Sequence, residues 1–275
     1  MTQSKPQEPE VKAIIKACAD QKSKSLDLSN FYLAELPTEL VELQWLEELD
    51  LISCGLTYLP PWIGDLPSLK SLYLSFNEIE YIPDEISKLS HLEKLNIMSN
   101  CLKKFPPGII ALSKLEYLAL GNNKIQEIPS EISRLSQMSY LYLNNNQITY
   151  LPQEIYLLRK LIKLDISHNK IQNLPQGIEN LFALKELYIN SNKIRHLPPE
   201  IGKLSKLKIL SIYENLIEYL PPTMSQLNLV RLHIDIEKLA FLHKRIDIEK
   251  LAFLHKGLDA LTHLSRREIN NRYTP

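Results

Sequence analysis

The residues that come nearest to a catalytic arrangement are Asp165, Ser167 and His168. Catalysis by a serine nucleophile needs a histidine base that is bonded to the hydroxyl and oriented by a carboxylate. Here the three residues follow one another along a predicted strand and its exit, which does not hold a base over an activated nucleophile. The sequence therefore predicts no catalytic role for them.

Other patterns that carry chemistry do not occur in the sequence. There is no GxxxxGK[S/T] phosphate loop, no GxGxxG, no HExxH and no CxxC pair. The seven histidines do not cluster at metal-ligand spacing, and the three cysteines, Cys18, Cys54 and Cys101, cannot form a disulfide framework. We expect a protein that is not an enzyme and has no cofactor, no metal and no small-molecule substrate.

Charge and hydropathy restrict the partners and the location. Lys plus Arg and Asp plus Glu number 32 each, so no global field attracts nucleic acid or an anionic membrane. The first twenty residues lack the apolar run of a signal peptide, and no uncharged apolar stretch of about 18 residues occurs. An odd cysteine count favours a reducing compartment. We expect a cytoplasmic protein, with export without a cleavable signal as the alternative.

An internal repeat sets the elements that position all these residues. Nine of the seventeen prolines recur every 23 residues, at Pro37, Pro60, Pro83, Pro106, Pro129, Pro152, Pro175, Pro198 and Pro221. Aligned on them, the chain reads LxxLxLxxNxIxxLPxxIxxLxxL. In LxL, two apolar residues flank a polar one, which is the period of a short strand with one buried face. Pro then stops the strand, and the apolar spacing of three in PxxIxxLxxL suits a short 3₁₀ or α turn.

This pattern resembles the leucine-rich-repeat family, and in particular its 23-residue class with LPxxIxxLxxL, found in bacterial proteins, Roco GTPases and Ras-pathway scaffolds. The resemblance implies an α/β fold, a right-handed horseshoe-shaped solenoid with short parallel strands on the concave face and short 3₁₀ or α turns on the convex face. In the third to ninth repeats an asparagine follows the strand, where a buried amide can satisfy backbone groups that no regular ladder reaches, whereas Phe31 and Cys54 take this place in the first two. We expect these amides to stack in a ladder.

A solenoid also needs caps at its ends, since its terminal repeats otherwise expose core. Val11, Ile14, Ile15 and Cys18 follow the stripe of an amphipathic helix. We therefore predict a helical cap over 1–22, nine repeats over 23–229, and a degenerate last repeat with a helical cap over 230–275. In the last segment IDIEKLAFLHK occurs twice, at 234–244 and 246–256. It is interpreted as an enlarged cap, or alternatively as a docking or self-association helix.

The concave face is the predicted binding surface, because aromatic side chains there have no core to fill. Aromatic residues ringed by Asn, Ser and Asp match the composition of interface hot spots. The predicted protein-binding residues are Tyr73, Phe76, Met98, Tyr117, Tyr140, Tyr142, His168, Tyr188 and Tyr213. The alternative is that these tyrosines only stabilise the strands. Tyr58, Tyr81, Tyr150 and Tyr219, which precede the Leu-Pro or Ile-Pro step, are interpreted as such structural tyrosines.

The most consistent function is a non-catalytic protein-protein interaction module that binds another protein on its concave face. Two alternatives stay open. One is a regulatory scaffold in signalling that acts in trans on a GTPase, kinase or phosphatase, following the resemblance to Roco and Ras-scaffold repeats. The other is an exported effector that engages host proteins.

Overall fold

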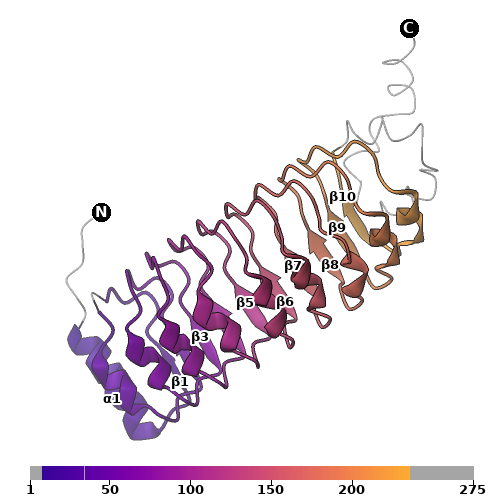
Figure 1. Cartoon of the computed structure of the whole chain (residues 1–275). Helices are drawn as coiled ribbons and strands as arrows, with labels where there is room; N and C mark the ends of the chain where they lie inside the picture. Colours follow the sequence, from indigo (N-terminus) through magenta and orange to yellow (C-terminus); the bar gives the residue numbers. More distant parts are fainter. Residues whose placement is uncertain (1–7, 34, 236–275) are drawn as a thin grey trace.

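The computed structural model describes residues 8–33 and 35–235. Its centre is one parallel sheet in which ten three-residue strands follow the order of the chain (Figure 1). The strands are β1 (Ser25–Asp27), β2 (Glu48–Asp50), β3 (Ser71–Tyr73), β4 (Lys94–Asn96), β5 (Tyr117–Ala119), β6 (Tyr140–Tyr142), β7 (Lys163–Asp165), β8 (Glu186–Tyr188), β9 (Ile209–Ser211) and β10 (Arg231–His233). Equivalent residues of β1 to β9 pair at the 23-residue offset of the sequence repeat.

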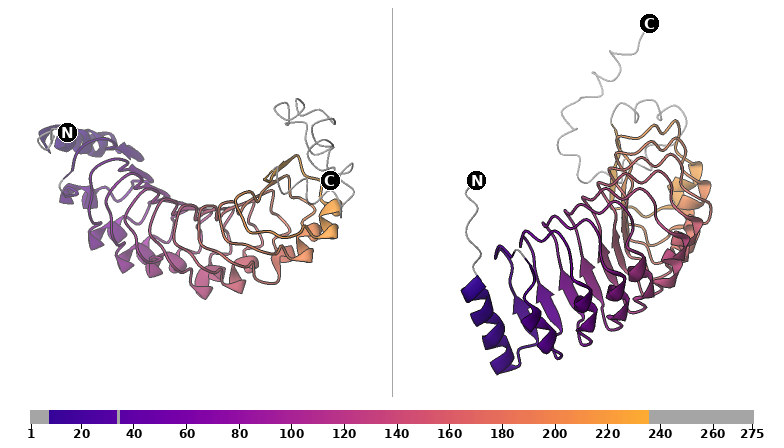
Figure 2. Two further views of the ribbon diagram at one scale, coloured as in Figure 1. Left: turned by 90° about the horizontal axis from the view of Figure 1, so that it is seen from above. Right: turned by 60° about the vertical axis from the view of Figure 1, so that its left-hand side comes forward.

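Short 3₁₀ helices lie on the opposite side of each turn, and the solenoid curves with these helices outside and the strands inside (Figure 2). The described helices are η1 (Thr38–Glu42), η2 (Pro61–Asp65), η3 (Asp84–Lys88), η4 (Pro107–Ala111), η5 (Ser130–Arg134), η6 (Gln153–Leu157), η7 (Ile178–Asn180), η8 (Pro199–Lys203) and η9 (Pro222–Gln226). Most begin directly after the proline that recurs every 23 residues, whose fixed φ ends the extended segment. The strand side is therefore concave, as the sequence predicts.

The core is a continuous stack of leucine and isoleucine. The middle residue of every strand is a leucine with at most 6% of its surface exposed, and Leu118 and Leu141 are fully buried. The second leucine of LxL, such as Leu120, is also fully buried. Because each repeat buries its apolar edge only against its neighbours, this stack carries the stability of the array.

The predicted asparagine ladder is present. The side-chain nitrogen of Asn146 donates to the carbonyl oxygens of Leu143 and Asn144 in its own turn, at 3.1 and 3.3 Å. It also donates to the carbonyl of Leu120 in the preceding repeat at 3.0 Å, and its Oδ1 accepts the N–H of Ile125 at 2.9 Å. The same set of contacts recurs at Asn100, Asn123, Asn169 and Asn192. These side chains thus replace backbone partners where the chain leaves the strand.

The first repeats depart from the ladder, and Cys54 occupies the asparagine place. Its Sγ lies 3.1 Å from the carbonyl oxygen of Leu28, the atom that an asparagine amide would bond at this position. Its own N–H is accepted by Oδ1 of Asn77 at 3.0 Å. Burial raises the pKa of the Cys54 thiol to about 12. A weak S–H donor therefore continues the ladder by one repeat.

Helix α1 (Glu8–Gln21) lies at the amino-terminal end of the solenoid and contributes Val11, Ile15 and Cys18 to the core. At the other end, β10 pairs with β9 at an offset of 22 residues. The carboxylate of Asp235 accepts the N–H of Glu214 at 3.1 Å, a position where earlier repeats supply a backbone carbonyl. The domain boundaries remain a prediction, and the duplicated IDIEKLAFLHK segment lies outside the described residues except for its first two.

Candidate functional site on the concave face

Two side chains of each strand point outward from the sheet, one before and one after the buried middle leucine. The first outward positions are Ser25, Glu48, Ser71, Lys94, Tyr117, Tyr140, Lys163, Glu186, Ile209 and Arg231. The second outward positions are Asp27, Asp50, Tyr73, Asn96, Ala119, Tyr142, Asp165, Tyr188, Ser211 and His233. Because successive side chains of a strand alternate between faces, both rows lie on the concave side.

Three tyrosines of β5 and β6 form the aromatic centre of this face. The rings of Tyr117 and Tyr140, which are partners in the strand register, have centroids 6.3 Å apart. Tyr117 also contacts Tyr142 diagonally, at 5.4 Å with an angle of 46° between the ring planes. Ala119, the register partner of Tyr142, is fully buried, and its small side chain leaves room for the diagonal contact. These tilted pairs have the geometry that aromatic rings favour.

A lysine extends this cluster across β7 and β8. The Lys163 ammonium lies 5.3 Å from the ring centroid of Tyr142 and 4.7 Å from that of Tyr188. It also pairs with a carboxylate oxygen of Glu186 at 3.0 Å, and the hydroxyl of Tyr188 donates to the same oxygen at 3.2 Å. Each ring and the carboxylate stabilise the charge of Lys163. We call Tyr117, Tyr140, Tyr142, Lys163, Glu186 and Tyr188 the aromatic cluster.

The surroundings of three of the cluster's tyrosines raise their pKa values. Burial is the main cause that raises the pKa of Tyr117, Tyr142 and Tyr188. Tyr142 also lies near the carboxylates of Glu186 and Asp165, which raise its pKa further, whereas Lys163 opposes the effect at Tyr188. The hydroxyls are therefore neutral donors at physiological pH. The cluster offers aromatic surface with polar edges and one partly shielded positive charge.

The other predicted residues lie farther along the face or at its edge. Tyr73 ends β3 and is half-buried, and Met98 and Tyr213 are half-buried beyond the ends of β4 and β9. Phe76 and His168 occupy the turn residue that precedes the asparagine, and each has a positive φ, of 58° and 53°. The structure thus brings four of the nine predicted residues into one cluster and distributes the rest around it.

Phe76 is the most exposed of the predicted aromatic residues, at 64%. All nine described turn residues of this position have φ between 52° and 66°, and Asn, Ser, His and Glu occupy the other eight. A bulky side chain in this left-handed region is strained, whereas asparagine tolerates it. The chain therefore holds a large apolar side chain in solvent on a backbone that disfavours it, a combination often associated with function.

Asp165, Ser167 and His168 do not form a catalytic arrangement. The hydroxyl of Ser167 donates to Oδ1 of Asp165 at 2.6 Å, and the Ser167 N–H donates to the same oxygen at 3.0 Å. The serine is thus bonded to the carboxylate rather than to an imidazole base, and His168 is exposed on the turn. Within residues 8–33 and 35–235, no group of three or more His, Cys, Asp or Glu side chains could hold a metal ion.

Sequence reasoning missed Lys163 and Glu186, which complete the aromatic cluster. The signal was available, because both residues occupy the same first outward position as Tyr117 and Tyr140. Reading that whole row, rather than only its aromatic members, would have identified them. Their distances to the rings could not be read from spacing, since they depend on the rotamer of a long lysine side chain.

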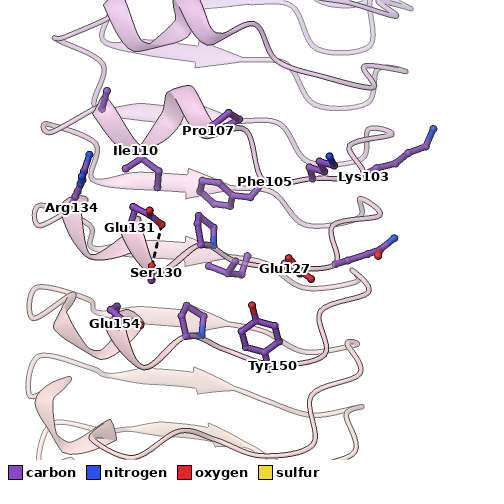
Figure 3. Close-up of a pocket in the computed structure, with 16 residues that line it drawn as sticks. Lys103, Phe105, Pro107, Ile110, Glu127, Ser130, Glu131, Arg134, Tyr150 and Glu154 are labelled. Carbon is purple, nitrogen blue, oxygen red and sulfur yellow. Dashed lines mark hydrogen bonds between the residues drawn. The ribbon is translucent and has the colours of Figure 1, made fainter.

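A second surface lies on the flank of repeats four to six, away from the concave face (Figure 3). It is a groove of about 1200 Å³ whose walls include Phe105, Ile110, Ile128 and Tyr150. Charged residues of both signs line it too, among them Lys103, Glu127, Glu131 and Arg134. None of the nine predicted residues lines this groove. Tyr150 is 51% exposed, so burial does not account for a tyrosine at this position.

Comparison with known families decides what this solenoid is. A model described as a leucine-rich repeat matches residues 46–102 and 182–239, and one described as a leucine-rich repeat region matches residues 106–192. The chain is a leucine-rich-repeat protein. The predicted fold, a solenoid of leucine-rich repeats, is thereby confirmed. No curated protein matches the sequence.

Solved structures of other leucine-rich-repeat proteins resemble this one. The leucine-rich-repeat ectodomain of the plant membrane receptor kinase GASSHO1/SCHENGEN3 from Arabidopsis thaliana, in complex with CASPARIAN STRIP INTEGRITY FACTOR 2, is 29% identical with a TM-score of 0.71. That match covers 80% of this chain and 27% of the receptor chain. An internalin from Listeria monocytogenes is 26% identical with a TM-score of 0.67, over 85% of this chain and 63% of the internalin.

A leucine-rich-repeat protein from Leptospira interrogans is 28% identical, with a TM-score of 0.55, over 76% of this chain and 71% of that protein. This chain thus spans less than two thirds of the receptor and internalin chains but most of the Leptospira chain. No helix among the described residues is long and apolar enough to cross a membrane.

Proposed function

We propose that this leucine-rich-repeat protein is a non-catalytic interaction module that binds another protein through its concave face. The aromatic cluster is the observation that carries the proposal. It places tyrosine rings, a lysine and a glutamate on the open side of a sheet whose opposite side is a continuous core. Tyrosine supplies a large contact area with few rotatable bonds, and it is enriched at binding hot spots.

The backbone below the cluster supports this use. β5 to β8 are joined by an unbroken parallel ladder, and the asparagine ladder ties the turns behind them. A surface built on such a scaffold loses little conformational freedom when a partner binds, so more of the contact energy appears as affinity. The plant receptor GASSHO1/SCHENGEN3 is in complex with CASPARIAN STRIP INTEGRITY FACTOR 2, and a second similar structure, the plant peptide hormone receptor RGFR1, is in complex with RGF2. Both are consistent with a protein or peptide partner.

The proposal extends to all nine predicted residues and to a reducing, cytoplasmic location. Beyond the aromatic cluster, Tyr73, Phe76 and Met98 widen the surface toward the amino-terminal end, and His168 and Tyr213 widen it toward the other end. Cys18 and Cys54 are buried free thiols and Cys101 is a half-buried one, which a reducing compartment would keep reduced. A finer role, as a regulatory scaffold of the Roco or Ras-scaffold type, would act through this same face.

The test is to replace Tyr142 and Tyr188 with serine and to measure which proteins the purified full chain captures from cell extract. We expect this variant to capture fewer of the proteins that the unmodified chain enriches. The substitutions remove both rings, and with them the contacts that hold the Lys163 side chain between the rings. The matched control is Tyr81→Ser with Tyr150→Ser, two exposed tyrosines of the flank. Circular dichroism checks that both variants are folded. If the concave variant captures the same proteins as the unmodified chain, the proposed surface is wrong.

A further inference from the structure

The concave face becomes acidic toward its amino-terminal end, where β1 and β2 carry three carboxylates. Asp27 and Asp50 are partners in the strand register, and Glu48 occupies the first outward position of β2. Within residues 8–33 and 35–235, none of the three takes part in an ion pair with a cation of this chain. They therefore present negative charge to whatever lies over this end of the sheet.

Backbone hydrogen bonds hold two of these carboxylates in place. Oδ1 of Asp27 accepts the N–H of Ser29 at 2.8 Å, and Oδ1 of Asp50 accepts the N–H of Ile52 at 2.9 Å. One oxygen of each is thereby used, and the other is left for an outside donor. Burial raises the pKa of Asp50, and the charges of Asp27 and Glu48 raise it further. A positive group placed among the three would relieve this repulsion.

A tyrosine occupies the equivalent position on the strand next to the carboxylates. Tyr73 is the register partner of Asp50 on β3, and its side chain is half-buried on the same face. A carboxylate next to the face of a tyrosine is a favourable site for a lysine or arginine head group. The described part of the chain shows this combination with a cation of its own, where Lys163 lies between the rings of Tyr142 and Tyr188 and pairs with Glu186. At β1 to β3 the same kinds of group are present without such a cation.

We infer that the partner is a protein segment that places a basic side chain over Asp27, Glu48, Asp50 and Tyr73, and an apolar side chain over Tyr117 and Tyr142. This inference rests on the proposed function and specifies the chemistry and direction of the partner. The negative end and the aromatic centre lie on different strands of one face, so a segment that satisfies both must cross the strands in a single direction. The reversed segment would place its cation near Lys163.

The spacing between the two anchors follows from the sheet geometry. Neighbouring strands lie about 4.8 Å apart, so the three to four steps from β2 to β5 and β6 span roughly 14–19 Å. An extended chain advances about 3.3 Å per residue. The basic and apolar anchors of an extended partner should therefore be separated by roughly four to six residues.

The test is a selection of random twelve-residue peptides, displayed on phage, against three forms of the full chain. The first is unmodified, and the second carries Asp27→Asn, Glu48→Gln and Asp50→Asn, which remove charge but keep shape and an oxygen that accepts the backbone N–H groups. The matched control carries Asp84→Asn, Glu154→Gln and Glu200→Gln, three carboxylates of the convex helices η3, η6 and η8. Selected peptides are then synthesised and their affinities measured by fluorescence anisotropy.

We expect peptides selected on the unmodified chain to carry Lys or Arg roughly four to six residues from an aromatic or aliphatic residue, in one order. The concave neutral variant should bind them on the order of tenfold more weakly, because the attraction between the basic side chain of the peptide and the three carboxylates is lost. The convex variant should bind them as the unmodified chain does. Equal binding by all three forms would overturn the inference.

Two outcomes separate the inference from the proposed function. The selected peptides are also measured against the chain that carries Tyr142→Ser and Tyr188→Ser. Peptides whose binding this variant loses but that show no basic residue would overturn the inference and leave the concave face as the binding surface. Selection of no peptide that depends on these tyrosines would overturn both. A dimer of the unmodified chain in sedimentation, which the concave neutral variant dissociates, would make a second copy the occupant and would also overturn the inference.

Discussion

The two sides of each strand in this protein follow opposite rules. On the buried side, all ten middle residues are leucine, from Leu26 to Leu232, and each is at most 6% exposed. On the concave side, the two outward residues form ten different pairs, from Ser25 with Asp27 to Arg231 with His233. On the buried side each leucine packs against the leucine of the next repeat, so stacking requires the same residue type in every repeat. The concave side has no such neighbour, which leaves its residues free to specify a partner.

The comparison extends to the turn that follows each strand. The ladder asparagines, such as Asn123 and Asn146, are at most 8% exposed and repeat the same hydrogen bonds. The residue just before each of them has a positive φ and varies from Asn122 to His168 to Phe76. In each of these turns the asparagine therefore stabilises the scaffold, and the variable residue before it belongs to the surface. Substitutions on the two sides should therefore have different effects on stability.

The largest effect is expected in the core, for Leu120→Ala. Leu120 is fully buried between neighbouring repeats, so its truncation loses apolar burial and leaves a cavity. We expect the free energy of unfolding in urea to fall by roughly 2–5 kcal/mol. The matched control is Leu157→Ala in η6, where the side chain is 48% exposed. A loss at Leu120 no greater than at Leu157 would contradict the register.

Most of the fold could be predicted because the buried side is periodic. The proline spacing gives the repeat length, and the LxL unit gives the strand with Leu118 inward and Tyr117 and Ala119 outward. The ladder could also be predicted, since an amide just past a strand must satisfy backbone groups there. Asp235, which replaces a backbone carbonyl beyond the last repeat, could not, because a single substitution outside the period leaves no pattern.

Less of the candidate site could be predicted, because outward side chains interact across repeats in ways that no period describes. Spacing places Tyr142 and Tyr188 on the correct face, but one strand, β7, lies between the strands that carry them. Lys163, which links them, was identified only from the structure. The flank groove beside Phe105 and Tyr150 also depends on how the side chains of adjacent repeats pack, which spacing does not define.

A somewhat smaller effect is expected in the ladder, for Asn146→Ala. The substitution removes the side-chain partners of the carbonyls of Leu120 and Leu143 and of the N–H of Ile125. Because a buried backbone group without a partner costs about 1–3 kcal/mol, we expect a net loss of roughly 2–4 kcal/mol in urea unfolding. The control is Asn173→Ala at an exposed position, where little change is expected. Equal stability of the two variants would show that the ladder contributes nothing to the fold.

The smallest effect, and the one with opposite sign, is expected at the turn for Phe76→Asn. Phe76 has a φ of 58° and is 64% exposed, so its replacement relieves backbone strain and loses little burial. Asparagine tolerates this region, and we expect a gain of roughly 0.5–1 kcal/mol in urea unfolding. The reverse change, Asn145→Phe, tests the same backbone position three repeats away, in the turn after β6, with a φ of 52°, and should cost a similar amount. If Phe76→Asn instead destabilises the protein, the ring contributes to the scaffold, and the division between the two sides does not hold at this turn. If it stabilises the protein and weakens the binding of selected peptides, the chain keeps Phe76 for its surface at the expense of its fold.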